Sequence, residues 1–293
     1  MELLQLKYFY SAARYESITR AAQQYGIPQP AMSQTISRLE KELGTQLFDR
    51  KSNRLTLNEN GKLFLKHVEA VLDNLSDGIM ALKEKNGDIK GEISLLVLEN
   101  RNMIIDWIVE FARLNPEVSF SICHNNIGDH SFNFDLCVSS RRMQPHLRKG
   151  IPLICEEIML AVPYHHALAK NKSVTLNSLK DERFITLPSQ YSLSQTVKEY
   201  CRAHGFEPKI SIICDDPYYI RKYVSLGMGV SFVPSFSWQG LWNENVIFLP
   251  IQGEKFTRTT YLIWDDRRYM TKAVQQFRDY IIEKASDYHI YQG

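Results

Sequence analysis

The segment 17–43 predicts two helices joined by a tight turn, and the second helix carries side chains that suit DNA reading. Its apolar residues recur at helical spacing and are expected to face a core: Met32, Ile36, Leu39 and Leu43. The opposite face is small, polar and uncharged: Gln29, Pro30, Ser33, Gln34 and Ser37. Short hydrogen-bonding side chains on a helix supported by a partner helix fit the base edges of a DNA major groove. We therefore predict that this polar face contacts DNA.

A basic hairpin is predicted directly after this helix. Two short strands, at about 46–50 and 54–57, flank a turn at 51–53. Basic side chains cluster at its tip: Arg50, Lys51 and Arg54. Such a cluster is more often just a solvated turn. Beside a helix-turn-helix, however, it favours contact with phosphates or with the minor groove.

The elements that position the polar face have recognisable ends. A first helix is predicted at 3–15, and Ser17 can cap the second. Gly26 ends the second helix where a positive φ is needed, and Pro28 and Pro30 mark the start of the third. The small pair at 21–22 lets the third helix approach closely.

Residues 1–65 resemble the N-terminal domain of LysR-type transcriptional regulators. The resemblance rests on the alanine pair at 21–22, QPAMSQTISRLEKELGTQLFDR at 29–50 and LTLNENG at 55–61. One position departs from the family, which commonly has arginine where this chain has Gln34. Glutamine cannot read guanine as arginine does and favours adenine or water-mediated contacts. The DNA preference of relatives therefore does not transfer.

A long helix without proline is predicted from Asn58 to about Lys85. Gly61 and six further apolar residues are spaced alternately by 4 and 3: Leu65, Val68, Leu72, Leu75, Ile79 and Leu82. This spacing favours pairing with a second copy of the helix, with ordinary packing on a core as the alternative. The resemblance implies the same dimer, whose two-fold axis would set two DNA half-sites whole turns apart, about 34 Å each. A hinge is expected at 86–88.

From Gly91 onward strands and helices alternate, which predicts an α/β fold with mostly parallel sheets. The whole chain is thus α+β multidomain, a winged helix-turn-helix and linker helix followed by this α/β part. The family resemblance continues more weakly in LAVPYHHALAKN at 160–171 and VSLGMGVSFVPS at 224–235. It implies two Rossmann-like lobes, similar to periplasmic binding proteins and joined by two crossing strands. The expected domains are 1–58 for DNA binding, 59–88 for the linker helix and hinge, 91–162 with 266–293 for lobe I, and 163–265 for lobe II.

One connection is short for this fold. Ten residues, 124–133, separate the expected strands at 118–123 and 134–138, although a parallel crossover normally needs a dozen or more. The family normally has a helix there that helps subunits meet. The usual contact between subunits is therefore in doubt.

Polar residues follow several strands, where ligands of open α/β sheets bind. The candidates are Asn100, Arg101, Asn102, Asn125, Ser139, Ser189, Gln190, Ser192 and Ser235. Helix N-termini nearby favour an anion, so a small carboxylate is the expected effector. The alternative role of each serine or asparagine is a helix cap, and Arg101 can also pair with Glu99 or Asp106.

No catalytic or metal-binding motif was found, so neither an enzyme, a cofactor nor a metal is predicted. Gly227 and Gly229 follow a helix and precede a strand, which indicates a turn and not a dinucleotide site. Asp215 and Asp216 precede Pro217 and are expected to cap the next helix. The five cysteines lack CxxC pairing and are expected to be mostly buried hydrophobes, with Cys201 and Cys214 as a less favoured redox pair.

Composition fits an ordinary water-soluble chain, with 44% hydrophobic residues, a net charge of +2 and no apolar run of about 20 residues. The charged, aromatic N-terminus does not resemble a signal peptide, so a cytoplasmic location without membrane contact is expected.

The resulting hypothesis is a LysR-type regulator that works as a dimer of dimers. A small effector between the lobes would change operator binding and bending and contact with RNA polymerase. Two alternatives stay open. One is a regulator whose effector pocket is collapsed, and the other is an enzyme or binding module with a helical N-terminus.

Overall fold

The computed structural model describes residues 1–51, 54–83, 89–124, 134–140, 149–238 and 245–288. They form two compact units. Unit 1 holds the described residues up to Lys83 together with 267–271, and unit 2 holds the others. The predicted hinge at 86–88, the connection at 125–133 and the wing turn at 52–53 lie outside the described residues. No helix in the described part of the chain is both long and apolar enough to cross a membrane.

Unit 1 is a three-helix core with a two-stranded wing and a long helix. Its elements are α1 (Leu3–Tyr15), α2 (Ile18–Gln24), α3 (Gln29–Leu43), β1 (Phe48–Lys51), β2 (Arg54–Leu57) and α4 (Glu59–Lys83). The helices meet over Phe9, Ala21 and Met32, all fully buried. Ile36 and Leu39 are buried as predicted, whereas Leu43 is 36% exposed. The prediction for Leu43 was wrong because α3 ends there and Gly44 turns the chain away with a φ of 67°.

The predicted helix ends are confirmed. The Ser17 hydroxyl accepts the Arg20 N–H at 3.2 Å, which caps α2. Gly26 has a φ of 63°, and α3 begins after Pro28. Local signals therefore place α3 against α1 and α2 and leave its polar face outside.

Helix α4 uses its predicted apolar seam in two ways. Near its start, Val68 is 2% exposed and packs in the unit 1 core, with Leu65 and Leu72 partly buried against it. Farther along, the seam is exposed: Leu75 42%, Ile79 47% and Leu82 67%. The first part thus follows the alternative of packing on a core, and the second part remains available for a second helix.

Unit 2 is built on a 7-stranded sheet of order β10-β6-β11-β5-β3-β4, with β9 also paired to β6. Within this sheet β3 pairs in parallel with β4 and β5, while β6 and β11 pair antiparallel with each of their neighbours. The expectation of mostly parallel pairing was therefore wrong. Its strands are β3 (Gly91–Val97), β4 (Val118–Cys123), β5 (Leu136–Ser139), β6 (Lys149–Pro163), β9 (Ser231–Pro234), β10 (Val246–Leu249) and β11 (Thr257–Trp264).

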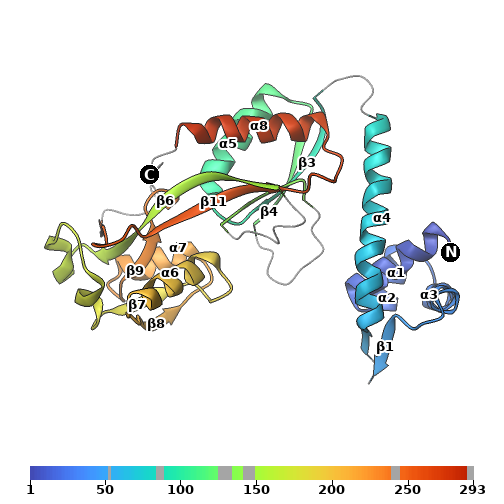
Figure 1. Ribbon diagram of the computed structural model, residues 1–293, viewed down its shortest axis with the longest axis horizontal. Helices are drawn as coiled ribbons and strands as arrows, with labels where there is room; N and C mark the ends of the chain where they lie inside the picture. The colour runs from blue at the N-terminus through green and yellow to red at the C-terminus, as the bar shows by residue number, and fades with distance from the viewer. Residues whose placement is uncertain (52–53, 84–88, 125–133, 141–148, 239–244, 289–293) are drawn as a thin grey trace. The chain divides into compact units, whose positions relative to one another are not determined.

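The strand β6 explains why the observed pairing differs from the expected, mostly parallel pairing. It runs for 15 residues, although the sequence of this segment does not mark one continuous strand. Pro152 and the pair Glu156 and Glu157 interrupt the apolar pattern that marks a strand. β11 lies beside residues 149–157 of β6, and the remainder of β6 pairs with β9 and β10, so that β6 extends through both halves of unit 2 (Figure 1).

Helices complete the two halves, here called lobe I and lobe II. In lobe I, α5 (Arg101–Leu114) and α8 (Lys272–Ser286) lie together over the sheet (Figure 1), with the rings of Phe111 and Phe277 4.9 Å apart. Lobe II surrounds a second core, in which Phe184 stacks on Phe232 at 5.1 Å. Its further elements are the parallel pair β7 (Arg183–Thr186) and β8 (Lys209–Ile213) with helices α6 (Ser192–Ala203) and α7 (Pro217–Ser225).

At Gly61, helix α4 lies tightly against the chain at Leu47 and Leu57. A Cβ at this position would overlap the Leu47 carbonyl oxygen, whereas one at Gly78 of the same helix would meet nothing within 4 Å. We expect Gly61→Ala to destabilise the folded chain by about 1–3 kcal/mol through overpacking. Gly78→Ala is the matched control and should stabilise α4 by up to about 1 kcal/mol. Urea unfolding of the full chain measures both changes in stability. Equal changes for the two variants would contradict the close packing of Gly61 against Leu47.

Candidate DNA-binding face and ligand cleft

The polar face of α3 lies at the surface of unit 1. Gln29, Pro30, Gln34 and Ser37 are exposed and Ser33 is half-buried. Arg38 is exposed next to Ser37, which adds a positive charge that the sequence reasoning left out of the polar face. The face therefore combines short hydrogen-bonding groups with at least one cation.

The wing is fastened to α3 by a carboxylate. Glu40 Oε1 accepts the backbone N–H groups of Leu47 at 2.8 Å and Phe48 at 3.3 Å. β1 and β2 then pair antiparallel, with Lys51 opposite Arg54. The side chains of Arg50, Lys51 and Arg54 lie outside the part of the chain that the structure describes, so their predicted contact with DNA stays a prediction.

Unit 2 contains a cleft of about 170 Å³ at the junction of its lobes. Four of the residues predicted to bind an effector line it: Asn100, Arg101, Asn102 and Ser192. The polar and aromatic lining residues that the sequence did not single out as ligand contacts are Glu99, Tyr191, Asp216, Tyr218, Arg221, Ser237, Trp238 and Arg258. Several come from α7 and β11, whose approach to β3 depends on the lobe arrangement and leaves no local sequence signal.

The other predicted contacts lie elsewhere. Ser139 is 1% exposed within β5 and pairs with Tyr261 of β11. Ser189 and Gln190 are exposed before α6, and the Ser235 N–H donates to the Glu157 carbonyl. Asn125 lies outside the described residues. Strand and helix ends were predicted only to within one or two residues, and this offset is enough to choose Ser139 where Ser140 contacts the cleft residue Glu99.

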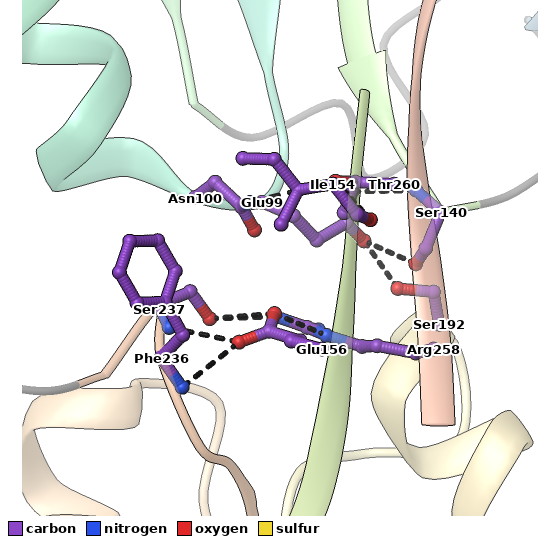
Figure 2. Close-up of polar contacts among 10 residues, drawn as sticks. All are labelled: Glu99, Asn100, Ser140, Ile154, Glu156, Ser192, Phe236, Ser237, Arg258 and Thr260. Atoms are coloured by element: carbon purple, nitrogen blue, oxygen red, sulfur yellow. Dashed lines mark hydrogen bonds and ion pairs between the residues drawn. The ribbon is translucent and has the colours of Figure 1, made fainter. Parts of the chain in front are cut away.

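Glu99 joins the two lobes across the cleft (Figure 2). Its carboxylate accepts the Ser140 N–H at 2.9 Å and the Ser140 hydroxyl at 3.1 Å. It also accepts the hydroxyl of Ser192, the first residue of α6. The N-terminus of α6, where the sequence predicted an anionic ligand, thus already has a carboxylate of the protein bound to it.

A buried ion pair forms one wall of the cleft. Arg258 of β11 and Glu156 of β6 are 6% and 3% exposed, with nitrogen–oxygen distances of 2.8 and 2.9 Å. The second Glu156 oxygen accepts the N–H groups of Phe236 at 3.2 Å and Ser237 at 2.8 Å (Figure 2). Because each charge is matched and hydrogen-bonded, this pair orders the segment after β9.

Two further polar side chains face the cleft. Asn100 has a φ of 54° and is 4% exposed, and its amide donates to the Thr260 hydroxyl at 3.4 Å. Arg221 of α7 lies against the rings of Tyr218 and Trp238, 6.0 and 5.7 Å from their centroids. Burial lowers the pKa of Arg221, and the nearby charge of Asp216 opposes that shift.

Asp216 caps α7 as predicted, because its carboxylate accepts the Tyr218 N–H at 2.7 Å. Arg101 pairs with neither Glu99 nor Asp106; it donates to the His124 carbonyl at 2.7 Å. The Gly227–Gly229 segment forms the predicted turn between α7 and β9.

Two family models match the chain. The bacterial regulatory helix-turn-helix protein model of the lysR family matches residues 3–62, and the LysR substrate binding domain model matches residues 87–286. The chain belongs to the LysR family of transcriptional regulators. This confirms the predicted resemblance and assigns the regulator a DNA-binding helix-turn-helix and an effector domain.

Curated relatives span the same length as this LysR-family regulator. An uncharacterized HTH-type transcriptional regulator, YybE of Bacillus subtilis, is 30% identical over 98% of this chain and 100% of its own. The transcriptional dual regulator GltC of the same organism is 27% identical over 100% of both chains. These relatives are named as regulators of transcription.

Solved structures confirm the fold. A full-length OxyR variant from Pseudomonas aeruginosa has a TM-score of 0.74 at 18% identity, covering 100% of this chain and 97% of that one. CbnR, a LysR family regulator solved in complex with its target DNA, has a TM-score of 0.65 at 19% identity, covering 97% and 100%. At these identities the likeness shows the architecture alone.

We expect Glu156→Gln to destabilise this LysR-family regulator by about 3 kcal/mol, because Arg258 then stays buried without a matching charge. Glu157→Gln is the control, since that neighbouring side chain is half-buried and should change stability by less than about 0.5 kcal/mol. Chemical denaturation measures both variants. An equal, small effect at the two positions would contradict the role of the ion pair.

The five cysteines are free thiols, and among the described residues no cluster of His, Cys, Asp and Glu could hold a metal ion. Burial raises the pKa of Cys201 from 9.0 to about 12. At pH 8 its thiolate fraction is therefore about a thousandfold lower than that of an ordinary thiol. We expect Cys201 to resist iodoacetamide in the native protein and to react once unfolded, as read by mass spectrometry. Rapid native labelling would contradict this burial.

Proposed function

We propose that this regulator binds an operator through the polar face of α3 and the wing, and senses a small metabolite in the cleft. The exposed face of α3 over a tightly packed core supports the first part. The proposed DNA contacts are Gln29, Pro30, Ser33, Gln34, Ser37, Arg50, Lys51 and Arg54. Residues 1–58 then form the DNA-binding domain, and 59–88 the linker helix and hinge.

The exposed part of the α4 seam supports a dimer. Leu75, Ile79 and Leu82 present large apolar side chains to solvent. A second copy of α4 would cover them and relate two α3 helices by a two-fold axis. We propose a dimer, assembled further into a dimer of dimers, that contacts RNA polymerase at its target promoters.

The cleft supports metabolite sensing. Lobe I (91–162 and 266–293) and lobe II (163–265) each provide lining residues, so a molecule bound there would change the preferred angle between the lobes. Arg221 supports an anionic group on that molecule, because its guanidinium Nε is buried without a partner. We propose that this change alters operator affinity and DNA bending.

Ser33→Asp tests the DNA-binding face. A carboxylate here would oppose the phosphates and the acceptor-rich base edges, and repulsion of several kcal/mol lowers affinity about 100-fold or more. Fluorescence anisotropy measures affinity for a DNA fragment selected by the unmodified protein, at fixed salt.

Asn74→Asp is the matched control because it adds the same charge on an exposed position of α4. It should leave affinity within about twofold, well inside a 1 kcal/mol change. Equal affinity of the unmodified protein and the Ser33→Asp variant, with both folded, would overturn the proposed face.

A further inference from the structure

The cleft carries a negative charge that no cation of the described residues neutralises. Glu99 is half-buried, and its carboxylate accepts hydrogen bonds from the backbone and hydroxyl of Ser140 and from the hydroxyl of Ser192. These donors are neutral, so they orient the carboxylate without cancelling its charge. The basic groups nearest in the cleft have other partners: Arg258 pairs with Glu156, and Arg101 donates to a carbonyl.

The same cleft contains a cation of the other lobe, Arg221, that is in no hydrogen bond or ion pair of the described residues. Its guanidinium Nε is buried. Its aromatic neighbours, Tyr218 and Trp238, hold the group in place without offering it an acceptor. The carboxylate of Asp216 accepts the N–H of Tyr218, and its charge acts on Arg221 without forming an ion pair with it.

The Asn100 side chain, next to Glu99 in the cleft, also lacks a hydrogen-bond donor for its oxygen. Thr260 donates its hydroxyl proton to the Ile154 carbonyl at 3.3 Å, so its oxygen must accept from Asn100. The Asn100 amide is therefore oriented with its NH₂ toward Thr260 (Figure 2). Its oxygen, Oδ1, is buried without a partner and needs a donor.

We propose that the cleft binds a small zwitterion of the amino-acid type. Its ammonium group would donate to Asn100 Oδ1 and neutralise Glu99, and its carboxylate would pair with Arg221. One molecule would thus satisfy both isolated charges and the buried amide oxygen, and it would join lobe I to lobe II. This inference rests on the proposed sensing role of the cleft and names the chemical class that the cleft senses.

The proposal is tested by comparing the binding of an amino acid with that of related molecules that carry only one of its two charges. An α-keto acid keeps the carboxylate but leaves Glu99 and Asn100 without a donor. An amine made by decarboxylation leaves Arg221 alone. Each loss removes a charge-assisted hydrogen bond, which weakens binding about tenfold or more.

The experiment is calorimetric titration of the full-length protein with each standard L-amino acid, its α-keto acid and its decarboxylated amine. At least one amino acid should bind at least about tenfold more tightly than its two counterparts. Tighter binding of a keto acid or an amine overturns the zwitterion but leaves sensing intact. Absence of binding by all three classes likewise overturns the zwitterion, while the regulator role is tested separately by operator binding in the same preparation.

Three variants test whether Glu99 and Arg221 bind the two charged groups of the ligand. Glu99→Gln keeps one oxygen to accept the hydroxyls of Ser140 and Ser192, loses the oxygen that accepts the Ser140 N–H, and removes the charge. It should weaken the amino acid about tenfold and leave its keto acid unchanged or tighter. Arg221→Met should abolish binding of both acids. Because it also removes a buried, unpaired charge, the melting temperature of the ligand-free protein should stay the same or rise. Glu254→Gln, at an exposed position, is the control and should bind normally.

A matching loss in Glu99→Gln for the amino acid and its keto acid would overturn the charge argument, since only the amino acid carries an ammonium group. A fall in melting temperature for Arg221→Met would likewise contradict the assignment of Arg221 to a ligand.

Discussion

The antiparallel pairing of β6 with β11 is the constraint on which the effector domain depends. The register places Arg258 beside Glu156, and their ion pair anchors the backbone at 236–237. Two residues farther along β11, Thr260 orients Asn100. β6 and β11 therefore pair with strands of both lobes and position Arg258 and Asn100 at the cleft. A ligand that changes the angle between the lobes would have to bend or twist the paired strands β6 and β11.

The DNA-binding unit depends on a few contacts of the same kind. The buried face of α3 sets its polar face outward, and Glu40 on the same helix fastens the start of the wing. Gly61 then lets α4 begin against Leu47. The recognition helix, the wing and the linker helix thus share a small set of interlocking residues, so a change in α4 pairing would be transmitted to the proposed DNA contacts.

Local signals predicted this unit well. Ser17, Gly26 and Pro28 act through their own backbone geometry, which can be read from the chain. The effector domain was predicted less completely, because the cleft is formed by pairing between distant segments. Glu99 was considered only as a neighbour of Arg101, and Arg221 sits in an ordinary amphipathic helix. Nothing local indicates that both charges lack an ionic partner, since that follows only once β6 and β11 bring the lobes together.

We propose that the protein is an operator-binding regulator whose cleft controls the DNA-binding unit. The decisive measurement is sequencing of the DNA fragments that the full-length protein retains, with and without a mixture of L-amino acids. We expect enrichment of one sequence with two related half-sites, and a change in its occupancy or protected length when the amino acids are present. Retention of DNA without any sequence preference in both conditions would contradict it.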